Sequence, residues 1–369
     1  MDDRDSLGND TFTVLLDWPS DKPKPRVGLL QDCGPFPQWT KYCRFLDTNA
    51  IPFALYDIHA RDWRARAGRY DVIIGLDSCE LSGLNEIRRK FYVLEHHMHR
   101  RCYPRYDDIL LYEDKILESY LADTYGLPFA RTYIYNCEKE ALAAAEEFSY
   151  PIVSKVVPGS GSVGVELVTS PSRCRAIIRK AFSPGGRQTH DPCAPQKDYV
   201  YLQEYIPNDG FDIRVIVVGN KMFGFYRKVP AGEFRASGMS LEEHRELPSQ
   251  ALRIAEKAYR AIKSPVLAVD MLRSPEGEYR IIEMSPQSRI CTCEELQVQG
   301  VPGYYTAEGN SYSFQPGRVW IQELALQEFF SREYGIPQGD LRRAGETGVP
   351  GRWDSLPDGQ RRVAVEKRR

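Results

Sequence analysis

Short apolar runs separated by helix-length segments mark the first third of the chain. The runs read RVGLL, FALYDI and DVIIGL, at residues 26–30, 53–58 and 71–76. Alternation of this kind is typical of a parallel sheet whose strands are connected by helices. We therefore expect a small open α/β domain over residues 26–105.

A second pattern begins near Tyr112, where helical segments alternate with strands and then give way to consecutive strands. The consecutive strands read YVYLQEYI, FDIRVIVVG and KMFGFYRKV, and the last two meet at Gly219 and Asn220, which is a hairpin signal. A predicted helix over about 243–262 precedes two further strands, PVLAVDML and YRIIEM. A last helix is expected over 319–335, so this region is α+β.

The two ends of the chain lack such periodicity. Residues 1–25 begin acidic and polar and end in DKPKP, and we expect a flexible leader there. Beyond residue 335 the Gly, Pro, Arg and Asp content predicts a disordered tail over 336–369.

Composition narrows the class of protein. The 369 residues are 42% hydrophobic and carry a formal net charge of −2, so no overall field favours nucleic acid or an anionic membrane. The N-terminus lacks the basic and apolar parts of a signal peptide, and no run reaches the ~18 apolar residues of a membrane span. Nine cysteines without a C-x-x-C pair fit reduced thiols. We expect a cytoplasmic protein with neither nucleic-acid nor membrane partners.

One glycine-rich loop carries candidate chemistry. Lys155 lies in the apolar strand IVSKVV, and PGSGSVG follows before another apolar strand. A Walker A loop and a dinucleotide fingerprint both lead into a helix, whereas this loop returns to a strand. It fits a flap whose backbone N–H groups close over polyphosphate oxygens. The simpler alternative is an exposed lysine on a strand edge.

Charged residues at strand ends add the other parts of a nucleotide site. Glu204 ends one apolar strand, and Asp212 and Arg214 alternate on the next. Asp270 and Glu283 lie on two strands joined by a short turn, where carboxylates can meet across the ladder and hold Mg²⁺. Each acid taken alone also fits a solvated strand end.

The order and spacing of these motifs resemble the ATP-grasp superfamily from about Glu113 to Arg289. The motifs that carry the resemblance are GLPFARTYI, PGSGSVGV, QEYI, DIRVIVVG, GEFRASG, AVDML and IIEMSP. The resemblance implies a small open parallel-sheet domain followed by a two-lobed ATP-grasp domain. The small lobe with the flap would span 106–200, and the large lobe with the metal site 201–335.

The resemblance also implies roles for individual residues. Lys115 and Lys155 would contact the α and β phosphates, with Lys155 also serving catalysis. The flap over the triphosphate would comprise Gly159, Ser160, Gly161, Ser162 and Gly164. Adenine would lie against Glu204 and the backbone near Tyr205 and Ile206, and Asp212 would contact the ribose or a neighbouring lysine.

The same resemblance implies the catalytic and metal residues. Asp270 and Glu283 would hold Mg²⁺, with Glu283 bridging, and Arg214 and Arg235 would bind the γ-phosphate or an acylphosphate. The family pattern Glu-x-Asn reads Glu-Met-Ser here, so Ser285 stands where an amide oxygen would be the stronger second-metal ligand.

The implied activity is that of an ATP-dependent carboxylate–amine ligase using ATP and Mg²⁺ or Mn²⁺. A small-molecule or peptide carboxylate would become an acylphosphate and then react with an amine, giving an amide or peptide bond, ADP and phosphate. Two alternatives stay open: a kinase acting on a hydroxyl, and a nucleotide-binding protein without catalysis. A homodimer is common among similar proteins.

Overall fold

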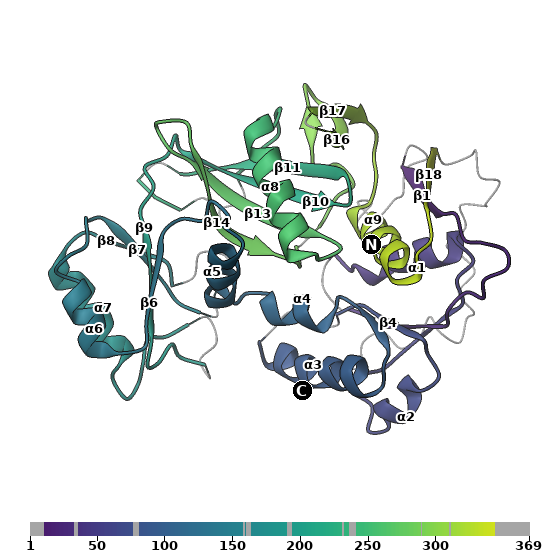
Figure 1. Ribbon diagram of the computed structural model, residues 1–369, viewed down its shortest axis with the longest axis horizontal. Helices are drawn as coiled ribbons and strands as arrows, with labels where there is room; N and C mark the ends of the chain where they lie inside the picture. Colours follow the sequence, from purple (N-terminus) through teal and green to yellow (C-terminus); the bar gives the residue numbers. More distant parts are fainter. Residues whose placement is uncertain are drawn as a thin grey trace.

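The described residues form three larger sheets and one two-stranded ribbon (Figure 1). This computed structural model describes residues 11–32, 36–76, 81–157, 159, 164–189, 194–230, 232–235, 241–288, 290–309 and 311–343. In Figure 1 the sheets lie at the lower right, at the left and in the centre, and α5 (Lys115–Thr124) lies between the left and central sheets.

The first sheet is parallel, as the alternation of apolar runs predicts. Its strand order is β3-β2-β4-β5, with bounds Phe53–Leu55, Val27–Leu29, Val72–Ile74 and Arg101–Tyr103. One face packs with α1 (Trp39–Thr48), and the opposite face carries Ile73 into a cluster with α3 (Leu81–Tyr92). A π-helical turn (Val93–His97) continues α3, and α2 and α4 span Trp63–Ala67 and Tyr106–Leu111. Both faces are therefore covered, which is why the central strands are apolar throughout.

The second sheet is antiparallel and forms what we call the small lobe. Its order is β6-β9-β7-β8, with bounds Thr132–Tyr135, Val200–Glu204, Ile152–Lys155 and Glu166–Val168. The helices α6 (Glu138–Ala144) and α7 (Pro171–Ala181) lie together on one side of it (Figure 1). Their buried side chains share one apolar cluster with β7 and β9, so the opposite face of the sheet is left for other contacts.

The third sheet forms the large lobe, and its main path is β14-β13-β10-β11-β16-β15. The bounds in that order are Tyr279–Ser285, Leu267–Arg273, Phe211–Val218, Lys221–Lys228, Val301–Glu308 and Gln297–Val298. The short β12 (Glu242–Glu243) pairs with β11, and β17 (Ser311–Pro316) pairs with β16. The predicted hairpin at Gly219 and Asn220 is confirmed, because Val218 pairs with Lys221. The helix α8 (Ser249–Ile262) packs on β10 and β13.

The described parts of the two chain ends, residues 11–25 and 336–343, differ from the flexible leader expected over 1–25 and the disordered tail expected over 336–369. Residues 12–16 form β1 (Phe12–Leu16), which pairs antiparallel with β18 (Gln338–Arg343). Val14 of β1 is buried, and Asn49 donates a hydrogen bond to its carbonyl. Tertiary packing therefore orders two segments whose own composition favours disorder.

The helix α9 (Ile321–Tyr334) explains how those ends are held. Four polar side chains of α9 are buried: Gln322, Glu323, Gln327 and Glu328. Gln327 donates to the carbonyls of Leu15 and Gly339, at 2.6 and 2.9 Å, and so joins β1 to β18. Glu323 pairs with Arg44 of α1. The helix is thus a core element, and its buried Gln327 and Glu323 find polar partners in three neighbouring segments, β1, β18 and α1.

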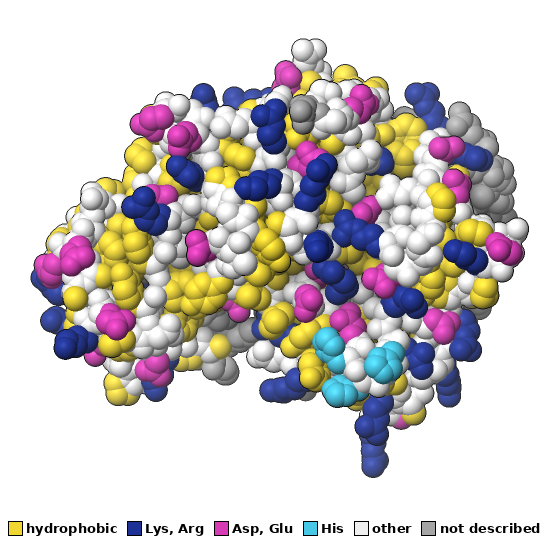
Figure 2. Space-filling view, in the orientation of Figure 1, with side chains coloured by type: hydrophobic (Ala, Val, Ile, Leu, Met, Phe, Trp, Pro, Cys, Tyr) yellow, Lys and Arg dark blue, Asp and Glu magenta, His cyan; other side chains and the backbone are white. Residues whose placement is uncertain are grey.

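Charged side chains of both signs are scattered over the face of the molecule seen in Figure 2, between apolar and uncharged areas. Figure 2 shows Lys and Arg interspersed with Asp and Glu over the visible face, in keeping with the net charge of −2. Among the described residues, no helix combines the length and the apolar character needed to cross a bilayer.

Replacing Arg44 with methionine should destabilise the fold, because Glu323 would keep a buried charge without its cation. We expect the Arg44→Met variant to lose about 3 kcal/mol in the free energy of unfolding, measured by urea denaturation. The control is Arg66→Met, which removes an exposed i,i+4 ion pair with Asp62 and should leave the free energy of unfolding nearly unchanged. Equal losses in both variants would contradict this account of α9.

Candidate nucleotide and metal site

A pocket between the two lobes draws its lining from β7, β9, β10, β11, β13, β14 and α5. Strand alternation decides which side chains reach it. On β10, Asp212 lines this pocket, whereas Phe211 and Ile213 line another cavity on the opposite face of the sheet. The pattern predicted from the sequence therefore places charged residues between the lobes and apolar residues behind them.

Two buried lysines bridge the lobes. Lys115, the first residue of α5, donates to the Gly159 carbonyl at 2.6 Å and to Glu283 Oε1 at 3.1 Å. Lys155, the last residue of β7, donates to the Ile282 carbonyl at 3.2 Å. Both ammonium groups thus lie beside β14. Lys155 is buried, so the alternative interpretation as an exposed lysine on a strand edge is wrong.

Asp270 and Glu283 meet as the sequence predicts. They are direct partners in the antiparallel pairing of β13 with β14, and the register shifts immediately after Asp270. Directly opposed carboxylates repel one another unless cations neutralise them. The neighbouring lysines and arginines supply that neutralisation.

A chain of ion pairs runs through the large-lobe side of the pocket. Arg214 binds Asp270 with two hydrogen bonds of 2.7 Å, and Arg227 approaches Asp270 Oδ2 at 2.7 Å. Arg227 also binds Asp212 with two hydrogen bonds, at 2.6 and 2.8 Å. The ion pairs therefore link Arg214 to Asp270, Asp270 to Arg227, and Arg227 to Asp212. Every oxygen of the two carboxylates accepts a hydrogen bond from a guanidinium group.

Gly224 lets the two arginine-bearing strands approach. It lies opposite Val215 in the β10–β11 pairing, and a Cβ at this position would lie 2.1 Å from the Arg214 carbonyl oxygen. The backbone contact therefore excludes any larger residue there.

The pKa values reflect burial and these partners. Burial alone would raise the pKa of Asp270, but Arg214 and Arg227 outweigh it and hold that pKa below its ordinary value. Burial lowers the pKa of Lys155 to about 8, although Glu283 opposes the shift. For Glu283, Lys115 and Lys155 outweigh burial and keep its pKa lowered. The pocket therefore holds ionised carboxylates and a lysine that sheds its proton unusually easily.

Glu118 is a buried acid beside the pocket residues Lys115 and Glu283 that the sequence did not single out. It is buried on α5, and its Oε2 accepts a hydrogen bond from the Met284 N–H at 2.8 Å. Burial raises its pKa to about 8 despite Lys115. Its spacing of three residues from Lys115 was the available signal, because i,i+3 side chains share a helix face.

The residues predicted to hold adenine form another part of the pocket lining. Glu204 at the end of β9 accepts the Arg131 N–H at 2.8 Å, and Tyr205 and Ile206 continue the wall. Asp212, predicted to contact ribose or a lysine, is bound by Arg227 instead, and its role toward a nucleotide stays a prediction.

The flap is described only at its two ends. Ser160, Gly161 and Ser162 lie outside the described residues. Gly164 has a φ of +71°, and a Cβ there would lie 2.2 Å from Val156 Cγ2. A glycine is therefore required where the loop returns to β8.

Two further predicted residues have partners within the protein. Arg235 lines the pocket and pairs with Glu233 at 3.0 Å. The Ser285 hydroxyl donates a hydrogen bond to the Gln287 carbonyl. Its predicted role as a metal ligand is not tested by this contact and stays a prediction. Among the described residues, no three His, Cys, Asp or Glu side chains gather in a metal-binding cluster.

Residues 113–296 match the model of the RimK-like ATP-grasp domain family. The match includes the lysines, carboxylates and arginines described above. The chain belongs to the ATP-grasp superfamily. The D-cycloserine synthetase DcsG has a similar fold, with a TM-score of 0.55 and 15% sequence identity over 83% of this chain and 99% of that chain. The predicted fold class, a parallel-sheet region followed by an ATP-grasp fold, is confirmed.

Curated relatives of this ATP-grasp protein are ligases. The tetrahydromethanopterin:alpha-L-glutamate ligase of Methanosarcina acetivorans is 28% identical over 169 residues, covering 45% of this chain and 51% of the relative. The glutamate–LysW ligase of Sulfurisphaera tokodaii is 26% identical over 177 residues, covering 47% and 59%. The chain thus spans between half and three fifths of the length of these relatives.

Replacing Lys155 with methionine should stabilise the ATP-grasp protein at neutral pH, because it removes a buried charge. The pKa is about 8 in the folded protein and 10.5 ordinarily, so between these values the unfolded chain binds more protons. Wild-type stability should therefore rise with pH across this interval. We expect Lys155→Met to gain about 1 to 3 kcal/mol at pH 7 by urea denaturation, and less above pH 10.

The matched control for this substitution is Lys180→Met on the exposed face of α7. It should leave stability and its pH dependence nearly unchanged. A Lys155→Met protein that is less stable than wild type at pH 7 would contradict the assigned burial cost.

Proposed function

We propose that this protein is an ATP-dependent ligase that couples a carboxylate to an amine. The observation that carries the proposal is the meeting of two buried lysines with the Asp270–Glu283 pair in one interlobe pocket, where Arg214 and Arg227 bind Asp270. A polyphosphate has several negative oxygens, and a pocket of this kind supplies fixed cations together with oxygen ligands for a metal.

The proposed nucleotide position follows from the donors. Lys115 and Lys155 would exchange their contacts with main-chain carbonyls for the α and β phosphates, which are stronger acceptors because they are charged. The base would lie against Tyr205 and Ile206, beside Glu204. Arg214, Arg227 and Arg235 would then face the γ-phosphate end, where a planar cation can bind two oxygens at once.

The donor set also fits a divalent cation. Asp270 and Glu283 provide the hard carboxylate oxygens that Mg²⁺ or Mn²⁺ prefers, and these two residues would hold the ion. When bound, the ion would neutralise charge on the phosphate oxygens. Binding of the ion would also compensate Asp270 and Glu283 for any arginine or lysine contacts that they give up to the nucleotide.

The proposed reaction has two displacements. An oxygen of the substrate carboxylate attacks the γ-phosphorus of ATP, the bond to the bridging oxygen breaks, and ADP and an acylphosphate form. The amine nitrogen then attacks the acyl carbon, the bond to the phosphate oxygen breaks, and inorganic phosphate leaves with the proton that the amine loses. The residues contribute position and charge rather than a covalent nucleophile.

The relatives guide the choice of substrates. Their names specify glutamate as the amino acid that is joined to tetrahydromethanopterin or to LysW. We infer an amino acid or peptide as one substrate here, and glutamate is the first amine to test. Substrates would be small molecules or peptides, and a homodimer stays an expectation drawn from the ATP-grasp resemblance alone.

One observation favours a second candidate function. The Ser285 hydroxyl is committed to the Gln287 carbonyl, and serine is a weaker ligand than the amide of the family pattern. A protein that binds ATP without turning it over would fit this feature. A kinase is the other alternative, and it would release ADP without free phosphate.

Turnover tests the proposal directly. Purified protein with ATP, Mg²⁺ and pairs of carboxylates and amines should release free phosphate only when both substrates are present. Lys155→Met should lower this rate by about 100-fold or more, because a charge that faces the transferring phosphoryl group is lost. Lys180→Met should retain the wild-type rate. Formation of ADP without release of inorganic phosphate would favour the kinase. Binding of ATP without formation of any ADP would favour the inactive protein.

Metal removal separates binding from turnover. Calorimetry should detect ATP binding with Mg²⁺, and EDTA should abolish it. The Glu283→Gln variant should weaken Mg²⁺-dependent ATP binding by about tenfold, equivalent to ~1.4 kcal/mol. Glu278→Gln, which alters an exposed carboxylate just before β14, is the matched control. Unchanged ATP affinity in Glu283→Gln would argue against the metal assignment.

A further inference from the structure

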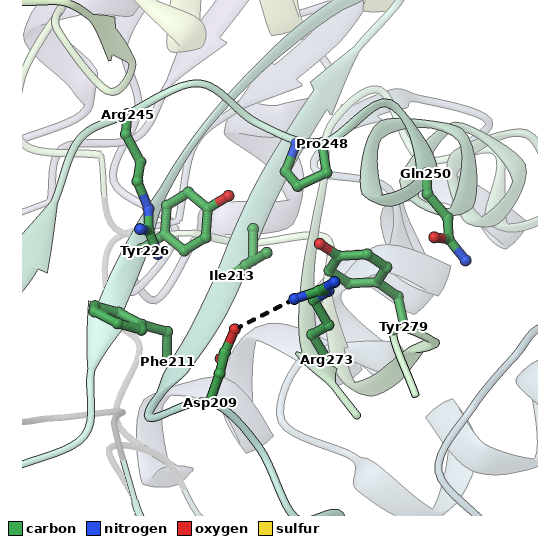
Figure 3. Close-up of a pocket in the computed structure, with 10 residues that line it drawn as sticks. Asp209, Phe211, Ile213, Tyr226, Arg245, Pro248, Gln250, Arg273 and Tyr279 are labelled. Atoms are coloured by element: carbon green, nitrogen blue, oxygen red, sulfur yellow. Dashed lines mark ion pairs between the residues drawn. The ribbon is translucent and has the colours of Figure 1, made fainter. Parts of the chain in front are cut away.

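A second cavity lies on the face of the large-lobe sheet that is turned away from the nucleotide pocket. Its volume is about 440 Å³, within the range of small-molecule sites. Figure 3 shows Phe211 and Ile213 of β10 and Tyr226 of β11 on one side, with Tyr279 and the start of α8 on the other. Strand alternation separates the cavities, because Asp212 and Arg227 on the same strands line the nucleotide pocket.

Two guanidinium groups stand at this cavity, each held by a different partner. Arg245 stacks on Tyr226 and Phe211, with its Cζ 3.8 and 4.6 Å from the ring centroids. Arg273 lies 3.9 Å from Asp209, a long and half-exposed contact (Figure 3). Ring stacking fixes the plane of one guanidinium while leaving its N–H edge available for an acceptor.

Charge and shape together define the ligand class. Among the lining residues, two arginines and Asp209 leave one positive charge in excess. The exposed Glu243, which does not line the cavity, lies 3.4 Å from Arg245 Nε and offsets part of that charge. The walls formed by Ile213, Tyr279 and the aromatic rings are apolar. A matching ligand has one carboxylate and an apolar or aromatic side chain.

We propose that this cavity binds the carboxyl-terminal residue of a peptide that carries a large apolar side chain. The terminal carboxylate would bind Arg245 and Arg273, and the side chain would pack on Tyr279 and Ile213. A peptide terminus fits better than a free amino acid, because a free ammonium group would lie beside two guanidinium groups and the lining carboxylate, Asp209, already pairs with Arg273. The proposal concerns a site separate from the ligase pocket and does not depend on turnover there.

The test uses N-acetyl-L-phenylalanine as the probe and N-acetyl-L-phenylalaninamide as its uncharged match, titrated by calorimetry with Mg²⁺ and ADP present. The acid should bind and the amide should bind at least about tenfold more weakly, as expected for loss of a charge-assisted hydrogen bond. Arg245→Gln and Arg273→Gln should each weaken acid binding by about tenfold. Arg280→Gln, a comparably exposed and ion-paired arginine outside the cavity lining, should not.

Several results would overturn the proposal. These are equal binding of acid and amide, equal binding in all three variants, and no binding of the acid at about 10 mM, where millimolar affinity is detectable. Free L-phenylalanine binding as tightly as the acetylated probe would overturn the assignment to a peptide terminus. ADP affinity should be unchanged in Arg273→Gln, because Arg273 does not line the nucleotide pocket. This measurement is the control that the nucleotide pocket of the variant is intact.

Discussion

The interlobe pocket depends on one constraint, which is that charges removed from water must be paired. Asp270 is buried and binds Arg214 and Arg227, and Arg227 also binds Asp212. Removing one member would leave an uncompensated charge in a low-dielectric interior. The register of β10, β11 and β13 follows from this requirement, because a slip of one residue would turn these groups toward the apolar face behind the sheet.

The same constraint links the two lobes. Lys115 contacts Gly159 on the small-lobe side and Glu283 on the large-lobe side, and Lys155 reaches across to the Ile282 carbonyl. These contacts satisfy the ammonium groups within the protein. In the proposed function, phosphate oxygens take over those contacts, so nucleotide binding exchanges one set of charge-assisted hydrogen bonds for another. Affinity then reflects a difference between the two sets rather than their sum.

Local sequence patterns predicted the parts of the site that depend on strand period and order. The Gly219 hairpin, the pairing of Asp270 with Glu283 and the placing of Lys155 on a strand before the glycine loop are of this kind. The ion-pair partners of Arg227 were not predictable, because a pattern shows that a cation faces a pocket but not which acid it binds. Glu118 was missed for a similar reason, since only the packing of α5 on β14 brings it to Met284.

The chain ends show the same limit at larger scale. β1 and β18 are more than three hundred residues apart in the sequence, and their pairing depends on buried side chains of α9. No periodicity in QGDLRR indicates a strand, so tertiary contacts alone decide its conformation.

The central claim is that Asp270 and Glu283 meet the lysines at one metal-bound triphosphate. Anomalous diffraction from crystals grown with Mn²⁺ and a non-hydrolysable ATP analogue tests it most directly. The account predicts a manganese peak within coordination distance of Asp270 and Glu283, with phosphate density beside Lys115 and Lys155. Manganese and phosphate density located away from these four residues would contradict it.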